Sequence, residues 1–204
     1  MSKGYKYSKR REPLQERSQQ MIEWILEAAF KLFSESGYEK TTTNEIAELA
    51  GVSIGAFYYY FPGKDAILVE LGKRHRQRMY KEVLNIIEDN PDEEIEGLTR
   101  EIVTRLVQLH EKEPLIIRAL NESTLIHKYL DSLKLKIDSE FWNEIEKKLV
   151  DRIGVEDPKR VVFFLKEIIL TITHNITSES YCGTNEEIIE SLTQVIMTSI
   201  YKKR

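Results

Sequence analysis

The sequence predicts an all-α protein, and three observations support this fold class. Apolar residues recur at spacings of three and four residues along most of the chain, which is the period of an α-helix. Strict alternation of apolar and polar residues, which marks half-buried strands, is nearly absent. Only five prolines and nine glycines interrupt the chain. Together with start and stop signals, these patterns predict about nine helices.

The composition is that of an ordinary soluble globular protein. The chain has 204 residues and a mass of 24.0 kDa; 41% of the residues are hydrophobic and 31% are charged. These proportions exclude disorder over the whole chain, and the length favours a small module joined to a larger one. No run of about 18 apolar residues occurs, and no apolar segment follows the basic start of the chain. We therefore expect no membrane span, no secretory signal and a cytoplasmic location.

Cysteine content and charge distribution exclude some kinds of site and point to one charged segment. The single cysteine, Cys182, excludes an internal disulfide and a cysteine-based zinc site, and it fits a reducing compartment. The net charge of −4 hides an asymmetry, because residues 1–20 carry six cations and two anions and the rest of the chain is strongly acidic. The basic arm, residues 1–17, is either a solvated tail or a source of nonspecific attraction to phosphates.

The first three predicted helices are close together. Residues 18–36 carry an apolar stripe, and Gly37 stands where a C-terminal cap belongs. A short helix then begins at Thr42, whose spacing to Glu45 predicts a capping box, and it is expected to bury Ile46, Leu49 and Ala50. After a tight break at 51–53, a third helix is expected over 54–60, capped by Ser53 and ended by Pro62 and Gly63.

The remaining predicted helices are longer. One covers 64–89 and ends before Pro91, and it would link the small module to the rest of the chain. Further helices are expected near 92–110, 114–127, 128–153, 158–180 and 185–202. Asp157 followed by Pro158 is a typical helix start, and Thr184 with Glu187 repeats the capping-box spacing. Gly154 and Gly183 occupy positions typical of C-terminal caps.

Two short helices joined by a turn that begins with glycine, preceded by a supporting helix, have the proportions of a helix-turn-helix. In that motif the second helix enters the major groove of DNA. A close resemblance to the DNA-binding motif of the tetracycline-repressor (TetR) family is carried by residues 41–61, TTTNEIAELAGVSIGAFYYYF, together with Lys64. The resemblance covers roughly residues 18–70, a third of the chain.

The resemblance implies a fold, a function and a set of partners. It implies a DNA-binding domain over residues 18–64 and a helical effector-binding and dimerisation domain over residues 65–204. The implied function is a ligand-responsive transcriptional regulator, acting as a repressor. It would bind a palindromic double-stranded operator as a homodimer and be released by a small-molecule effector that the sequence does not identify. No cofactor is implied.

The candidate DNA-binding residues are hydroxyl, amide, aromatic and basic residues of the two short helices and their flanks: Thr42, Thr43, Asn44, Ser53, Ile54, Gly55, Tyr58, Tyr59, Tyr60 and Lys64. Thr42, Thr43 and Ser53 can meet phosphate oxygens, and Tyr58, Tyr60 and Lys64 can add further donors. Asn44 can pair with an adenine edge, and Ile54 can touch a thymine methyl. Gly55 leaves a flat helix face that permits close approach.

Several other residues of this region have a different interpretation. The resemblance makes Ile46 and Phe57 core positions, and we expect Phe61 to be core as well because aromatics at helical spacing usually pack inside. By the same resemblance, the position of Tyr59 lies near DNA. A second basic cluster on the 64–89 helix is interpreted as a solvated face: Lys73, Arg74, His75, Arg76, Arg78 and Lys81.

The sequence gives no support to an enzyme. Residues 51–55 match the G-x-S-x-G pattern of hydrolases, but that motif needs a strand before the serine, and here a helix is predicted. The four histidines, His75, His110, His127 and His174, lack the spacing of a metal site, so no metal is expected. Phosphate-cradling glycine loops are also absent.

The C-terminal segments carry two further predictions. The last two helices hold more apolar surface than one stripe needs, and in TetR-like proteins such helices form the dimer interface; the candidates are Phe164, Ile168, Ile172, Ile189, Leu192 and Ile196. An intramolecular core is the competing interpretation. Candidates for an effector pocket are aromatic or imidazole side chains: His110, Tyr129, Phe141, Trp142, Phe163 and His174.

Two alternative functions remain open. One is an interaction protein of TetR fold that has lost its DNA site and dimerises with a regulator. The other is an enzyme or small-molecule binding protein built on the C-terminal domain. Binding to duplex DNA at low salt argues against the first, and absence of turnover of a pocket ligand argues against the second.

Overall fold

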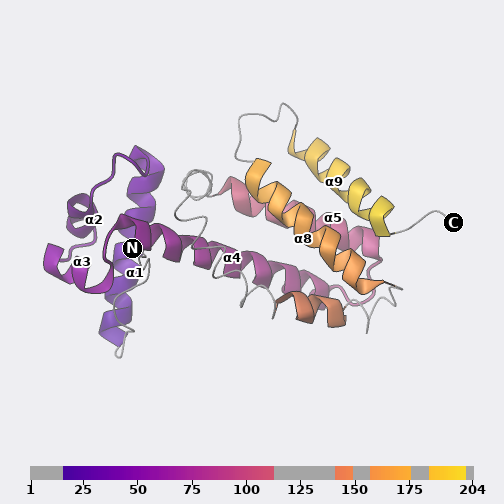
Figure 1. Cartoon of the computed structure of the whole chain (residues 1–204), viewed down its shortest axis with the longest axis horizontal. Helices are drawn as coiled ribbons and strands as arrows, with labels where there is room; N and C mark the ends of the chain where they lie inside the picture. Colours follow the sequence, from indigo (N-terminus) through magenta and orange to yellow (C-terminus); the bar gives the residue numbers. More distant parts are fainter. Residues whose placement is uncertain (1–15, 113–140, 149–156, 176–183, 201–204) are drawn as a thin grey trace, which may run out of the picture. The chain divides into compact units, whose positions relative to one another are not determined.

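A computed structural model describes residues 16–112, 141–148, 157–175 and 184–200, and all regular secondary structure in these ranges is α-helical (Figure 1). The described residues form two compact units, and the boundary falls inside one long helix, between His75 and Arg76. Predictions for the basic arm, for the helix at 114–127 and for Tyr129 lie outside these ranges. No helix in the described ranges is long and apolar enough to cross a membrane.

Helix α1 (Glu16–Ser36) supplies much of the core of the first unit. Its buried residues recur at helical spacing along one face: Ile22, Ile25, Leu26, Ala28, Ala29 and Phe33. Gly37, which follows the last residue of the helix, has a left-handed backbone (φ +84°) and donates its N–H to the Phe33 carbonyl at 3.1 Å. Glycine adopts this conformation without steric cost, so the predicted C-terminal cap is confirmed.

Helix α2 (Thr43–Leu49) begins with the predicted capping box. The Glu45 amide donates to Thr42 Oγ1 at 3.3 Å, and the Thr42 amide donates to the Glu45 carboxylate at 2.8 Å. Ile46 and Ala47 are buried. The prediction that Leu49 is buried was wrong, because its side chain in the last turn is 46% exposed.

Helix α3 (Ile54–Tyr60) follows a turn of three residues. Gly51 has a left-handed backbone (φ +66°), which lets the chain reverse after α2. Ser53 is the N-cap, and its hydroxyl oxygen accepts from the Ala56 amide at 3.1 Å. Phe57 and Phe61 are fully buried, as predicted. The left-handed glycine, the serine cap and the buried phenylalanines therefore explain why this segment folds as a helix-turn-helix.

Helix α4 (Lys64–Asp89) has the predicted bounds and contributes to both units. Its first turns bury Ala66, Ile67, Leu68 and Val69 in the first unit. Its later turns bury Met79, Val83, Ile86 and Ile87 in the second.

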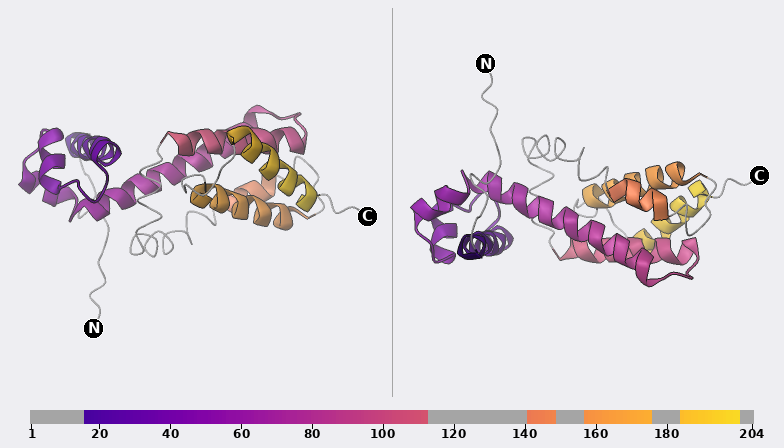
Figure 2. Two further views of the ribbon diagram at one scale, coloured as in Figure 1. Left: turned by 90° about the horizontal axis from the view of Figure 1, so that it is seen from above. Right: turned by 90° about the horizontal axis from the view of Figure 1, so that it is seen from below.

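The second unit is built from α5 (Ile95–Glu111), a helical segment at 141–148, α8 (Pro158–Asn175) and α9 (Asn185–Ile200). Helices α5, α8 and α9 pack against one another, as Figure 2 shows. The ring of Tyr80 stacks on Phe141 with centroids 3.9 Å apart and an interplanar angle of 5°. The predicted starts of α8 and α9 are confirmed by capping bonds to Asp157 (3.1 Å) and Thr184 (3.3 Å).

Candidate DNA-binding surface

Helix α3 has an inner and an outer face. Phe57 and Tyr60 point into the core of the first unit, and both are less than a tenth exposed. The outer face carries three large side chains that are partly exposed to solvent. Their exposed fractions are 40% for Ile54, 40% for Tyr58 and 46% for Tyr59. Exposed apolar and aromatic residues gathered on one helix face mark a contact surface.

Gly55 lies between these side chains on the same outer face, and the fold does not require a glycine there. A Cβ atom added to Gly55 would meet only Ser53 Oγ, at 3.9 Å, an ordinary contact distance. Its φ angle is not in the left-handed region either, unlike those of Gly37 and Gly51. An external partner that approaches the backbone closely would supply the missing reason for glycine.

The start of α2 is joined to the outer face of α3. Thr42 and Asn44 are exposed, and Thr43 is half-buried. Thr43 Oγ1 and the Tyr58 hydroxyl are hydrogen-bonded at 3.0 Å across 15 residues of sequence. Hydrogen bonds from the backbone N–H and the side chain of Thr42 lower the pKa of Glu45. The two short helices therefore present one joint polar and aromatic surface.

The structure corrects the prediction for Tyr60. Its side chain is 6% exposed, and its hydroxyl donates to Met21 Sδ at 3.7 Å. Residue 60 follows Phe57 by three positions, which puts both on the inner face of α3. Tyr60 is therefore a core residue of the first unit.

Lys64 also differs from its prediction as a donor to DNA phosphates. Its ammonium donates to three backbone carbonyls, those of Tyr38 (2.8 Å), Glu39 (3.0 Å) and Thr41 (3.2 Å). It also lies 4.5 Å from the centre of the Tyr38 ring. A lysine ammonium has three N–H donors, and all of them are occupied.

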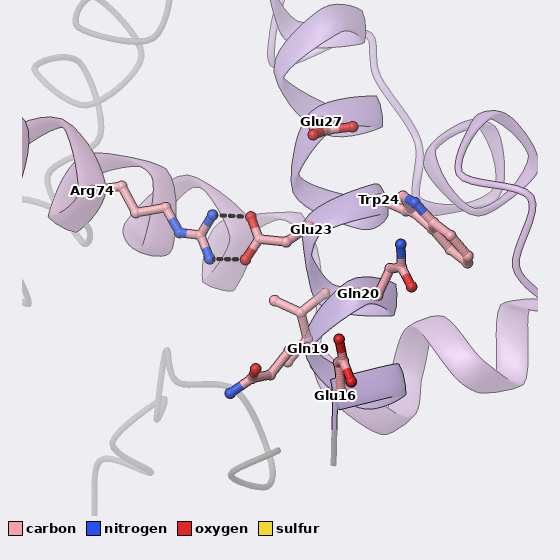
Figure 3. Close-up of a pocket in the computed structure, with 8 residues that line it drawn as sticks. Glu16, Gln19, Gln20, Glu23, Trp24, Glu27 and Arg74 are labelled. Atoms are coloured by element: carbon pink, nitrogen blue, oxygen red, sulfur yellow. Dashed lines mark hydrogen bonds and ion pairs between the residues drawn. The ribbon is translucent and has the colours of Figure 1, made fainter. Parts of the chain in front are cut away.

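The predicted basic face of α4 is partly neutralised. His75 is buried, and Lys73 lies 3.5 Å from Glu70. Arg74 forms a two-pronged pair with the carboxylate of Glu23 on α1, one prong at 2.7 Å (Figure 3). The hydrogen bond to Glu23 raises the pKa of Arg74 further above its ordinary value.

The Arg74–Glu23 pair borders a polar pocket of about 520 Å³ (Figure 3). Its lining is rich in carboxylates and amides and includes one half-exposed indole: Glu16, Gln19, Gln20, Ile22, Glu23, Trp24, Glu27 and Arg74. This pocket lies on α1 and the first half of α4, and of the predicted effector residues whose side chains are described, Phe141, Trp142 and Phe163, none lines it.

The predicted effector residues are scattered. Phe141 and Trp142 are buried in the core of the second unit, with ring centroids 4.8 Å apart. Phe163 is 57% exposed on α8, which is unlike the wall of an enclosed cavity. Tyr129 and the side chains of His110 and His174 lie outside what the structure describes.

The residues predicted to form the dimer interface differ in burial. Ile196 is fully buried within its own chain and is a core residue. Phe164, Ile189 and Leu192 are partly buried. The side chains of Ile168 and Ile172 lie outside the described part of the chain. Val195 on α9, which is not among the six candidates, is 52% exposed. Helical spacing alone does not tell the two sides of an apolar helix apart.

The hydrolase-like pattern at 51–55 lies between two helices, with α2 ending just before it. The Ser53 hydroxyl serves as a helix cap. A nucleophile elbow instead needs a strand that leads into the serine.

A supporting helix, two short helices joined by a tight turn, and an exposed outer face on the second define a helix-turn-helix protein. Comparison with known proteins agrees with this class. Residues 25–71 match the family described as bacterial regulatory proteins, tetR family. The helix-turn-helix segment of this chain is therefore similar to the DNA-binding domain of the TetR family.

Individual relatives are similar over different lengths. The uncharacterized HTH-type transcriptional regulator YuxN of Bacillus subtilis is 42% identical over 62 residues, which are 30% of this chain and 21% of YuxN. The chain covers less than half of the length of the first curated relatives that it matches.

Solved structures resemble the fold over nearly the whole chain. A TetR-family regulator from Mesorhizobium loti has a TM-score of 0.68 at 18% identity, over 91% of this chain and 97% of the other. Thermus thermophilus FadR, a TetR-family repressor solved with lauroyl-CoA, has a TM-score of 0.63 at 20% identity, over 90% of this chain and 96% of the other. At these identities the likeness shows the fold.

Proposed function

We propose that this chain is a transcriptional repressor that binds a palindromic DNA operator as a homodimer and releases it when a small molecule binds. The outer face of α3 would enter the major groove, with Ile54 against thymine methyl groups. Asn44, near the start of α2, would reach a base edge, while Thr42, Thr43, Ser53 and Tyr58 would contact the phosphate backbone.

Gly55 carries this proposal. The protein leaves the position open although its own fold has space for a side chain. Glycine early in a helix lowers helix stability by roughly 0.5–1 kcal/mol relative to alanine. A DNA backbone or base edge packed against the α3 backbone accounts for that cost, since a side chain at residue 55 would hold α3 away from the groove.

A homodimer follows from the size of the DNA-reading surface. One helix-turn-helix reads only a few base pairs, so a specific operator requires two copies on half-sites about 10 base pairs apart or a multiple of that. Exposed Phe163 on α8 and Val195 on α9 are the apolar residues best placed to be covered by a second copy. Phe164, Ile189 and Leu192 would line the edge of that contact.

Release by an effector would act through α4, because this single helix takes part in both compact units. Tyr80 on α4 stacks on Phe141 in the core of the second unit, so a ligand that repacks these rings would displace α4. Such coupling is typically worth about 1–3 kcal/mol, or 5- to 150-fold in operator affinity. Induction with unchanged spacing of the two recognition helices would count against this mechanism.

Selection of duplexes from a random pool by the purified protein tests the proposal. A selected palindrome is expected, and Tyr58→Phe together with Asn44→Ala should weaken its binding. A matched variant, Asn185→Ala on α9, should bind the palindrome as the unmodified protein does. No enrichment even at low salt, where attraction to phosphates is strongest, would contradict DNA binding.

A further inference from the structure

Lys64 lies at the first position of α4, yet all three of its donors point to the turn between α1 and α2. The accepting carbonyls belong to Tyr38, Glu39 and Thr41, so one cation collects three carbonyls from four consecutive residues. Such a concentration of carbonyl dipoles is favourable around a positive charge and unfavourable without it. The ammonium is therefore part of the structure of this turn.

Other contacts bind the same turn. The Tyr38 hydroxyl donates to Asp65, the residue that follows Lys64 in α4. The Tyr38 ring packs edge-on against Phe33 at 5.1 Å and lies beneath the Lys64 ammonium. The hydroxyl of buried Thr41 donates to the Gly37 carbonyl at 2.8 Å. The chain that enters α2 is therefore held from the start of α4.

The residue that follows this turn is Thr42, the N-cap of α2, and next to it is Thr43, whose hydroxyl is bonded to Tyr58. We propose that Lys64, together with Asp65, is a positioning residue that fixes the DNA-facing start of α2, and that its ammonium does not contact DNA. This inference rests on the proposed DNA-binding function. Through this contact the first turn of α4 would reach the DNA-binding surface.

Salt dependence separates a positioning role from a phosphate contact. A lysine on a phosphate releases a counterion, so its loss lowers the slope of log affinity against log salt by about 1. A lysine that only positions α2 can weaken binding while that slope stays unchanged. Arginine gives a second distinction, because its guanidinium reaches phosphates well but its planar fork does not fit a socket of three carbonyls built for a compact ammonium.

The experiment measures binding of the selected operator duplex over a series of salt concentrations for the unmodified protein, Lys64→Arg and Lys64→Met. We expect both variants to bind at least about 10-fold more weakly with an unchanged salt slope. The matched control is Lys31→Arg, the same substitution at an exposed position of α1, and it should bind like the unmodified protein. Normal affinity of Lys64→Arg, with a lower slope for Lys64→Met, would overturn the proposal.

Hydrogen exchange of the DNA-free protein provides a readout that does not depend on the operator. Lys64→Arg should speed amide exchange in residues 37–46 while the rest of α1 and α4 keeps its protection. Unchanged exchange in residues 37–46 would overturn the clamp even if DNA binding fell. If the unmodified protein bound no duplex, the proposed function would fail, and the exchange result would still decide whether Lys64 holds this turn.

Discussion

Three adjacent tyrosines, Tyr58, Tyr59 and Tyr60, lie in one turn of α3 but differ in their surroundings. Tyr60 is 6% exposed and bonds Met21, whereas Tyr58 and Tyr59 are 40% and 46% exposed on the outer face. The Tyr59 and Tyr60 rings meet edge-on at 4.9 Å, so the outer ring is also braced by the inner one. Composition cannot separate these roles, but the position of each residue on the helix does.

Gly55 gives the residue-scale prediction. Gly55→Glu should leave the thermal unfolding temperature unchanged or raise it, because the site is open and a carboxylate in the first turn favours the helix dipole. Operator affinity should fall about 10- to 100-fold, because the carboxylate repels DNA and fills the groove side of α3. Calorimetry and fluorescence anisotropy measure the two effects.

The smaller Gly55→Ala substitution is the control for charge, and it should weaken binding less. Operator affinity equal to that of the unmodified protein in both variants would mean that residue 55 does not approach DNA.

At the scale of elements, α2 and α3 have seven residues each and are too short to be stable alone. Helix α2 is capped by the side chain of Thr42, and helix α3 is capped by that of Ser53. Each helix also packs a fully buried residue into the core of the first unit, Ile46 from α2 and Phe57 from α3. Capping and packing therefore both stabilise the candidate DNA-binding surface.

The capping box predicts an acid-dependent weakening of α2. The pKa of Glu45 is lowered in the folded protein, so the stabilisation is fully present above its ordinary value of 4.5 and is lost as pH falls through the lower folded pKa. Glu45→Gln should unfold at a lower temperature than the unmodified protein at pH 7. The two unfolding temperatures should converge in acid, because protonated Glu45 resembles glutamine. A constant difference from pH 7 to strong acid would contradict this role of the carboxylate.

The Arg74–Glu23 pair is an element-scale contact between α1 and α4. Its side chains are 31% and 48% exposed, so solvent screens the attraction. A double-mutant cycle with Arg74→Met and Glu23→Gln should give a coupling free energy of about 0.2–1 kcal/mol in chemical denaturation, reduced by added salt. Zero coupling at low salt would show that the pair does not hold the helices together.

Local chemistry explains how much of the fold could be predicted. Caps at Thr42, Ser53, Asp157 and Thr184 are side-chain-to-backbone bonds within three residues, so sequence spacing reveals them. The socket of Lys64 joins residues more than 20 positions apart and leaves no local pattern. Burial of Tyr60 and exposure of Leu49 depend likewise on which side of a short helix meets its neighbours.

At the scale of the whole molecule, the exposed apolar residues of the second unit are the surface that a second copy would cover in the proposed homodimer. Phe163→Glu and Val195→Glu should each shift the protein toward monomer and raise the dimer dissociation constant about 10-fold or more. Analytical ultracentrifugation measures the shift. Gln108→Glu, an exposed change on α5, is the matched control and should leave assembly unaltered. Dimers of normal strength in both apolar variants would place the interface elsewhere.

The two tryptophans of the chain lie in different units and different surroundings. Trp24 on α1 is 44% exposed, and Trp142 is 8% exposed beside Tyr80 and Phe141. Their intrinsic fluorescence should differ in emission maximum and in access to aqueous quenchers. With Trp24→Phe or Trp142→Phe, the remaining indole would report on one unit alone. These single-tryptophan variants would therefore follow the proposed operator binding and the proposed effector binding separately, without any added label.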